Sequence, residues 1–157
     1  MPVKKKVVKK TEQQKFVDFG TAVTRFWTKY AEFDGAAQRS EYWFAVLFLF
    51  LVECGLNFLV DSIPFMGILY GMWSVAIIIP CLSLSARRLH DAGFSAKWLL
   101  GFWGTILLGI MVLMFGKVSM VFMLLAEALW VVAGGFAIFL FVTSLLPSKT
   151  KDNPYLK

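Results

Sequence analysis

The sequence has little charge and few of the residues that usually carry metal or redox chemistry. Charged residues make up 17% of the 157 positions, where a soluble domain has roughly 25%. Two cysteines and one histidine are too few to define a disulfide framework or a spaced set of metal ligands. We therefore expect no metal and no cofactor.

The hydrophobic residues, 59% of the chain, are concentrated in four long runs that contain almost no charge. A membrane-spanning helix needs roughly 20 mostly apolar residues. The runs lack the period-two alternation of strands, and an open sheet would leave backbone groups unsatisfied in lipid. The sequence therefore predicts an all-α polytopic membrane protein with four transmembrane helices. The predicted spans are residues 43–60, 63–84, 98–115 and 122–146, within a membrane domain of residues 34–147.

The basic residues are distributed unevenly around these runs. Nine of the 16 precede the first span, three lie between spans two and three, and three lie in the tail, residues 148–157. The turn at Asp61 and Ser62 has none, and the turn between spans three and four has only Lys117. Because basic residues collect in cytoplasmic loops, we predict a multi-pass protein of the bacterial inner membrane with both termini in the cytoplasm.

Two segments precede the first span. Residues 1–11 form a basic tail, which we expect to be disordered and to contact anionic lipid headgroups rather than nucleic acid, since no recognition motif follows. Residues 12–33 carry apolar side chains at helical spacing, which predicts an amphipathic helix. That helix would lie in the membrane interface or pack on the cytoplasmic ends of the bundle. Its apolar residues are Phe16, Phe19, Val23, Phe26, Tyr30 and Phe33.

Three polar segments share the predicted cytoplasmic side, at residues 32–43, 85–98 and 151–155. Their side chains predict either an ion-pair lattice that ties the segments together or a site for anionic lipid or a protein partner, because the Arg fork suits phosphate and carboxylate. The candidate residues of this layer are Arg39, Glu41, Arg87, Arg88, His90, Asp91 and Asn153.

His90 also raises the alternative of a lipid-directed enzyme. General acid–base work would need the imidazole beside a substrate proton. Its sequence neighbour Asp91 is no catalytic partner by adjacency alone, because neighbouring side chains usually diverge. The leading prediction is therefore a non-catalytic membrane protein.

Glu53 is the one acidic residue near the middle of a predicted span, and Asn57 lies one helical turn further on. A charge at that depth costs at least about 2.5–3.5 kcal/mol unless it is paired, hydrated or protonated. One interpretation is a protonated Glu53 that is hydrogen-bonded inside the bundle, with Ser74 and Thr105 as candidate partners. The alternative is a small transporter or channel that uses Glu53 and Asn57.

The polar segments also carry a recognisable pattern, with Arg39, Glu41 and Trp43 before span one, Pro80 and the run 87–93 (RRLHDAG) before span three, and Asn153 and Tyr155 near the end. Over about residues 25–157 the chain resembles the small bacterial inner-membrane family of domain of unknown function 805 (YhaH-like). This resemblance implies a fold and a location. It implies no reaction, because that family has no established biochemical activity. A homo-oligomer or a membrane protein partner stays open, since glycines in spans three and four allow close helix approach.

Overall fold

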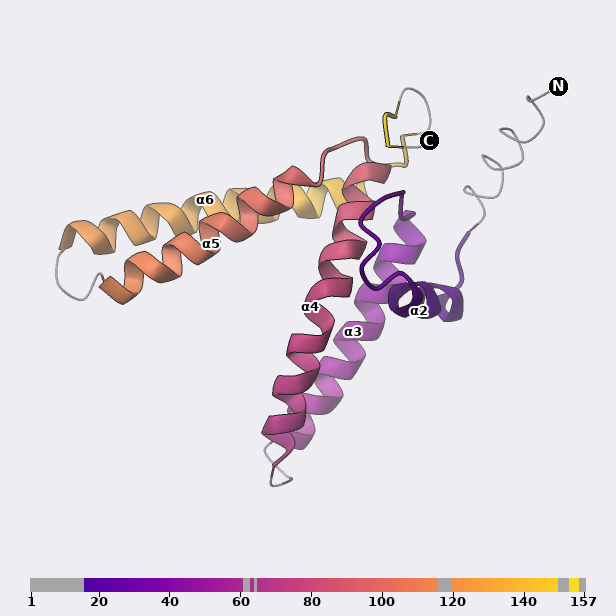
Figure 1. The fold of residues 1–157 in the computed structure, drawn as a ribbon, viewed down its shortest axis with the longest axis horizontal. Coiled ribbons are helices and arrows are strands. Elements are labelled where there is room, and N and C mark those ends of the chain that lie inside the picture. Colours follow the sequence, from indigo (N-terminus) through magenta and orange to yellow (C-terminus); the bar gives the residue numbers. More distant parts are fainter. Residues whose placement is uncertain (1–15, 61–62, 64, 116–119, 150–152, 156–157) are drawn as a thin grey trace.

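The computed structural model describes residues 16–60, 63, 65–115, 120–149 and 153–155. All regular secondary structure in these residues is helical (Figure 1). The helices are α2 (Phe19–Thr28), α3 (Arg39–Val60), α4 (Met66–Asp91), α5 (Lys97–Phe115) and α6 (Met120–Leu145). Within the described part, α3 to α6 are long and apolar enough to cross a membrane. The predictions for residues 1–11, the turn at Asp61 and Ser62, and Lys117 lie outside the described residues.

The four long helices form two hairpins, α3 with α4 and α5 with α6, which meet at one end and diverge from it (Figure 1). We call the shared end the junction. It comprises residues 39–45 of α3, 80–91 of α4, 97–103 of α5 and 139–145 of α6. Helix α2 packs across α3 and α4 near this end.

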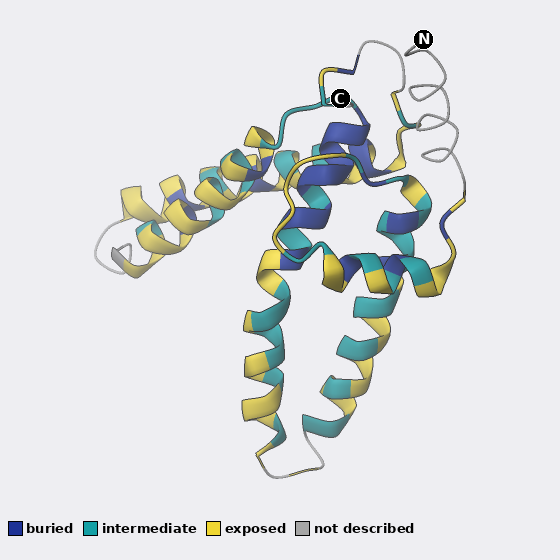
Figure 2. Ribbon diagram, turned by 45° about the vertical axis from the view of Figure 1, so that its right-hand side comes forward, coloured by how far each residue is buried: buried dark blue, intermediate teal, exposed yellow. Residues whose placement is uncertain are grey.

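Burial is concentrated at the junction, whereas the outer parts of both hairpins expose apolar side chains (Figure 2). Arg87 and Arg88 are 1% and 2% exposed, while Phe65 at the far end of the first hairpin is 82% exposed. Soluble monomers rarely expose contiguous apolar surface of this extent. The distribution is that of helices whose apolar surface is covered by hydrocarbon rather than by other protein.

Helix α4 is longer than the hydropathy predicts. The predicted span ends at residue 84 and places residues 85–98 in a loop, but α4 continues to Asp91, so that Arg87, Arg88 and His90 are helical. The apolar run ends at Leu84, yet the helix goes on because the polar side chains that follow find partners on other elements. The loop is residues 92–96, where Gly93 adopts φ +86°, a conformation that glycine reaches without steric cost. Likewise, α3 begins at Arg39 rather than at residue 43.

Helix α2 covers only the middle of the predicted 12–33, of which residues 12–15 lie outside the described part of the chain. It begins after Asp18, whose side chain accepts from the Thr21 backbone N–H at 3.0 Å, an N-cap that satisfies one free amide of the first turn. Its residues Ala22 and Phe26 are buried; Phe26 belongs to a small core with Ala45 and Leu84. The helix therefore packs on the junction, and its location in a membrane interface stays a prediction.

A proline inside α4 fixes the segment that follows α2. Pro80 has no N–H, so the carbonyl of Ala76 lacks its helical donor. The Tyr30 hydroxyl donates to that carbonyl at 2.6 Å. The Ser83 hydroxyl lies 2.9 Å from the Lys29 carbonyl and 2.7 Å from the Glu32 carbonyl. These bonds hold residues 29–32 against α4.

The second hairpin packs through small residues. A Cβ at Gly101 would lie 3.0 Å from the Phe136 ring, and one at Gly109 would lie 3.7 Å from Leu129. Ala126 and Ala133 of α6 are buried, as expected where two backbones approach closely in a membrane helix pair. Three other glycines that we expected to allow close helix approach face open space in this chain, namely Gly104, Gly134 and Gly135.

Candidate functional site

The first part of the site is a buried acid held between two arginines. Glu41, in the first turn of α3, is 3% exposed. Its Oε1 accepts from Arg87 of α4 at 2.8 Å, and its Oε2 accepts from Arg25 of α2 at 3.0 Å. The Arg25 side chain is 43% exposed, whereas that of Arg87 is 1% exposed. Glu41 thus joins three helices, and the pair that it makes with Arg87 is fully desolvated.

Arg88 connects α4 to the end of α6. Its guanidinium donates to Asp91, to the Ser144 carbonyl at 3.2 Å and to the Leu146 carbonyl. The last carbonyls of a helix have no intrahelical donor, and the Arg88 guanidinium supplies donors to carbonyls at the end of α6. Asp91 is held in turn by the Ser148 hydroxyl at 2.6 Å. All of these groups belong to the junction or to the chain just after it.

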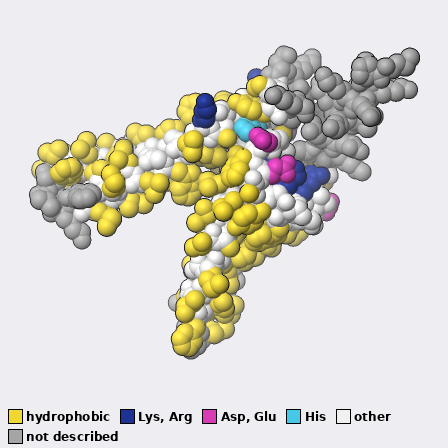
Figure 3. All heavy atoms as spheres, viewed as in Figure 1, with side chains coloured by type: hydrophobic (Ala, Val, Ile, Leu, Met, Phe, Trp, Pro, Cys, Tyr) yellow, Lys and Arg dark blue, Asp and Glu magenta, His cyan; other side chains and the backbone are white. Residues whose placement is uncertain are grey.

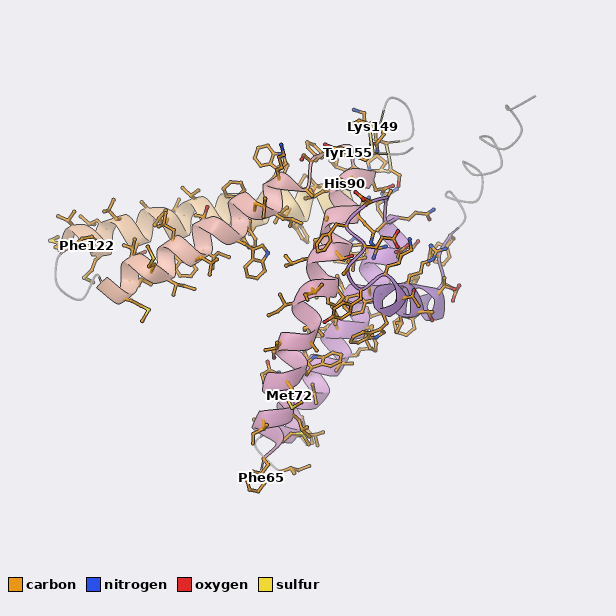
Figure 4. The ribbon with its side chains drawn as sticks, viewed as in Figure 1. Phe65, Met72, His90, Phe122, Lys149 and Tyr155 are labelled. Carbon is orange, nitrogen blue, oxygen red and sulfur yellow. The ribbon has the colours of Figure 1, made fainter. Side chains whose placement is uncertain are left out.

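The described part of the tail returns to the end of α4. The Asn153 side-chain amide donates to the carbonyl of His90 at 2.7 Å and to that of Lys149 at 3.0 Å. The Tyr155 ring stacks on the His90 ring with centroids 4.2 Å apart. Figure 4 shows His90, Lys149 and Tyr155 together at the junction, away from Met72 and Phe122 on the hairpins. The tail therefore closes over the last turn of α4.

His90 is 8% exposed, and its Nδ1 is buried without a hydrogen-bond partner among the described residues. The Asp91 carboxylate is occupied by Arg88 and Ser148 and is not oriented as a base for the imidazole. In the described residues this ring packs against Tyr155. In the part of the chain that the structure describes, no group of three or more His, Cys, Asp or Glu could hold a metal ion.

Arg39 differs from the other two arginines of the predicted layer. It is exposed, and its NH1 donates to the Leu145 carbonyl at 3.3 Å rather than to an acid. Arg87 keeps two buried nitrogens, Nε and NH2, without a partner among the described residues. The buried layer is thus an ion-pair lattice, and the basic groups that solvent can reach surround it. Those exposed or half-exposed groups are Arg25, Lys29, Arg39, Lys97 and Lys149.

The charged side chains gather at the junction, while hydrophobic side chains cover both hairpins on the face shown in Figure 3. Two carboxylates, Glu41 and Asp91, face the buried guanidinium groups of Arg87 and Arg88, so the interior of the lattice is balanced. A balanced interior leaves the surrounding exposed basic side chains as the groups that could bind an anion.

Glu53 and Asn57 lie apart from this lattice. The Trp73 indole N–H donates to Glu53 Oε1 at 3.2 Å, and Asn57 donates to the Glu53 carbonyl at 2.9 Å. The partners that we expected for Glu53 donate elsewhere: the Ser74 and Thr105 hydroxyls bind carbonyls of their own helices. The acid is therefore held within the α3–α4 hairpin.

Comparison with known proteins agrees with this architecture. The family described as "Protein of unknown function (DUF805)" matches residues 30–157. The chain belongs to this family. The curated relatives include "Inner membrane protein YhaI" of Escherichia coli K12 and of Escherichia coli O157:H7, each 36% identical over 77 residues. The match covers 46% of this chain and 63% of the relative's length. No solved structure matches the chain.

Sequence reasoning missed several members of the lattice. Arg25 lies before the DUF805 match and in a different predicted segment. The carbonyls of Ser144 and Leu146 leave no sequence signal, because any residue supplies a backbone oxygen. The hydrogen bond from Tyr30 to the Ala76 carbonyl, outside the lattice, was also missed. The sequence did carry a signal for it, because Pro80 within a helical run implies a free carbonyl at Ala76.

Proposed function

We propose that this DUF805 protein is a non-catalytic integral protein of the bacterial inner membrane whose junction faces the cytoplasm and binds anionic lipid headgroups. The observation that carries the proposal is the pairing of a charge-balanced buried lattice with exposed basic side chains at one end of two apolar hairpins. Basic residues near a membrane surface attract anionic lipid at about 1 kcal/mol each.

The membrane placement rests on the four long apolar helices and on the inner-membrane relatives. The orientation rests on the basic residues, 15 of 16 of which lie on one side of the predicted spans. Ser95 lies in the loop 92–96 at the junction. In a variant that lacks Cys54 and Cys81, a Ser95→Cys thiol should react with an impermeant maleimide only after the cytoplasmic face is opened. Labelling from the periplasm of intact cells would overturn the orientation.

The lipid proposal is tested by extracting the protein in polymer nanodiscs from vesicles of phosphatidylglycerol and phosphatidylcholine. We expect phosphatidylglycerol to be enriched around the wild type relative to the bulk vesicle. Lys97→Gln with Lys149→Gln should bring the ratio toward bulk, because both side chains are exposed at the junction. The matched control is Lys117→Gln, between α5 and α6. A wild type without enrichment would contradict the proposal.

A further inference from the structure

A pocket of about 220 Å³, partly open to the outside, lies at the junction where α3, α4, α5 and α6 meet. Its lining changes along its depth. The walls nearest the helix ends hold the polar lining residues Tyr42, Ser85, Arg88, Thr143 and Ser144, beside the apolar Leu89 and Leu99. The walls about one turn further into the hairpins are apolar and include Cys81, Leu82, Phe102, Trp103 and Leu140. A ligand that matches both parts has a polar group at the junction and an apolar chain directed between the hairpins.

We propose that this pocket holds part of one acyl chain of an anionic glycerophospholipid whose phosphate binds Arg39. The inference rests on the proposed function, because it requires the junction to lie at the headgroup level of a membrane. The pocket is smaller than the roughly 300–1,000 Å³ of sites for drug-sized ligands. It therefore fits a narrow chain rather than a compact ring system.

Arg39 is the headgroup ligand, and Arg88 in the pocket lining is not. The Arg88 guanidinium is 2% exposed and already donates to Asp91 and to the carbonyls of Ser144 and Leu146. Arg39 lies one turn before Tyr42 on α3 and contacts the Leu145 carbonyl, next to pocket residue Ser144. Because Arg39 is exposed and pairs with no acid among the described residues, its fork can meet a phosphate.

A protein occupant fits the same space poorly. A helix with its side chains is about 10–12 Å across, too wide for a pocket of about 220 Å³. A second copy of an apolar span would also place hydrocarbon against Tyr42, Ser85 and Thr143, and would leave Arg39 without an anion. The polar groups of the lining lie at one end of the pocket, and the exposed Arg39 guanidinium lies next to that end. Both features match a single lipid.

The test is native mass spectrometry of the full chain, equilibrated in detergent with either phosphatidylglycerol or phosphatidylcholine. The wild type should retain one phosphatidylglycerol. Cys81→Trp fills the pocket and should lower that retention at least tenfold. Cys54→Trp is the matched control, because Cys54 is an exposed residue of α3 outside the pocket, and its retention should equal that of the wild type. Wild-type retention by Cys81→Trp would overturn the proposal.

Arg39→Gln keeps the test informative if Cys81→Trp fails to fold, because residue 39 is exposed. The variant should still retain one lipid but lose at least fivefold of the preference for phosphatidylglycerol over phosphatidylcholine. Equal retention of both lipids by the wild type would overturn the role of Arg39. Displacement of the lipid by millimolar glycerol phosphate would show that the site binds the anionic group without binding an acyl chain. That result would also overturn the proposal.

Failure of this inference is distinguishable from failure of the proposed function. The Lys97→Gln, Lys149→Gln double variant should keep its one retained phosphatidylglycerol while it loses general enrichment of that lipid. A wild type that retains the single lipid but shows no enrichment overturns the proposed function alone. A wild type that shows enrichment but retains no lipid in the pocket overturns the inference alone.

Discussion

The junction and the outer parts of the hairpins reverse the usual distribution of a soluble protein. At the junction, Glu41, Arg87 and Arg88 are buried. On the hairpins, large apolar side chains such as Met72 and Met114 are 65% and 77% exposed. In water this arrangement would be costly twice, once for desolvated charge and once for exposed hydrocarbon. In a bilayer the second cost disappears, so specific contacts concentrate where polar groups must find each other.

The largest expected effect comes from breaking the junction at Glu41. Glu41→Ala leaves the 1%-exposed Arg87 without its acid, which should cost about 3–5 kcal/mol of unfolding free energy. Glu32→Ala is the matched control, since Glu32 pairs with Lys29 at the surface and such pairs contribute about 0–1 kcal/mol. Unfolding in mixed dodecylsulfate micelles measures both.

The Glu41→Met, Arg87→Met double variant sharpens the same comparison. Replacing both buried partners by apolar side chains is often close to neutral, and Arg25 is exposed enough to return to water. The double variant should therefore be more stable than Glu41→Ala. If the double variant and Glu41→Ala destabilise the protein equally, the loss of stability in Glu41→Ala does not come from leaving the Arg87 charge unpaired.

Two glycines test whether backbone constraint is also confined to the junction. Gly93 has φ +86°, and an added Cβ would lie 2.7 Å from Cδ of Lys149. Gly93→Ala should lower stability by about 1–2 kcal/mol, the usual cost of left-handed backbone for an L-residue. Gly134 on α6 faces open space, and Gly134→Ala should stabilise by up to about 0.5–1 kcal/mol. The same micelle titration measures both variants. Equal changes in stability would contradict the idea that backbone constraint is confined to the junction.

A smaller effect is expected at the bond between Tyr30 and the free carbonyl of Ala76. Tyr30→Phe should cost about 0.5–1.5 kcal/mol, the net value of one hydrogen bond. In a Pro80→Ala background, the new backbone N–H can serve that carbonyl, so Tyr30→Phe should cost less. A double-mutant cycle measures the difference; identical costs in the two backgrounds would show that Tyr30 acts through packing alone.

The smallest effect is expected at the start of α2. The Thr21 hydroxyl and then the Thr21 backbone N–H lower the pKa of Asp18 below its ordinary 3.8. Because the folded-state pKa is the lower one, the stabilisation is complete above the unfolded pKa and is lost as the pH falls through the folded value. Asp18→Ala should remove this acid-range dependence of stability, and Asp18→Asn should remove it while keeping an acceptor. A wild-type profile that matches Asp18→Ala would contradict the assignment.

The comparison also shows which parts of the fold hydropathy can predict. Helices α3, α5 and α6 coincide with the apolar runs to within a few residues, because length and hydrophobicity alone decide whether a segment suits a bilayer. Hydropathy failed at α4, where the helix continues through Ser85 to Asp91. The polar end of that helix depends on partners from α3, α6 and the tail, and no local window contains them.

The sequence by itself determined the number of long apolar helices, the family and the identity of the charged residues that gather at one end. Tertiary structure alone decided that Glu41 binds Arg87 and Arg25, that Arg88 binds the end of α6, and that Arg39 stays exposed beside a pocket. The physical reason is that the free energy of transferring a segment into hydrocarbon is a sum over its own residues, so a local stretch of sequence is enough to estimate it. A hydrogen bond or ion pair instead requires two groups to meet in space, and these can lie far apart in the sequence, as Arg39 and Leu145 do.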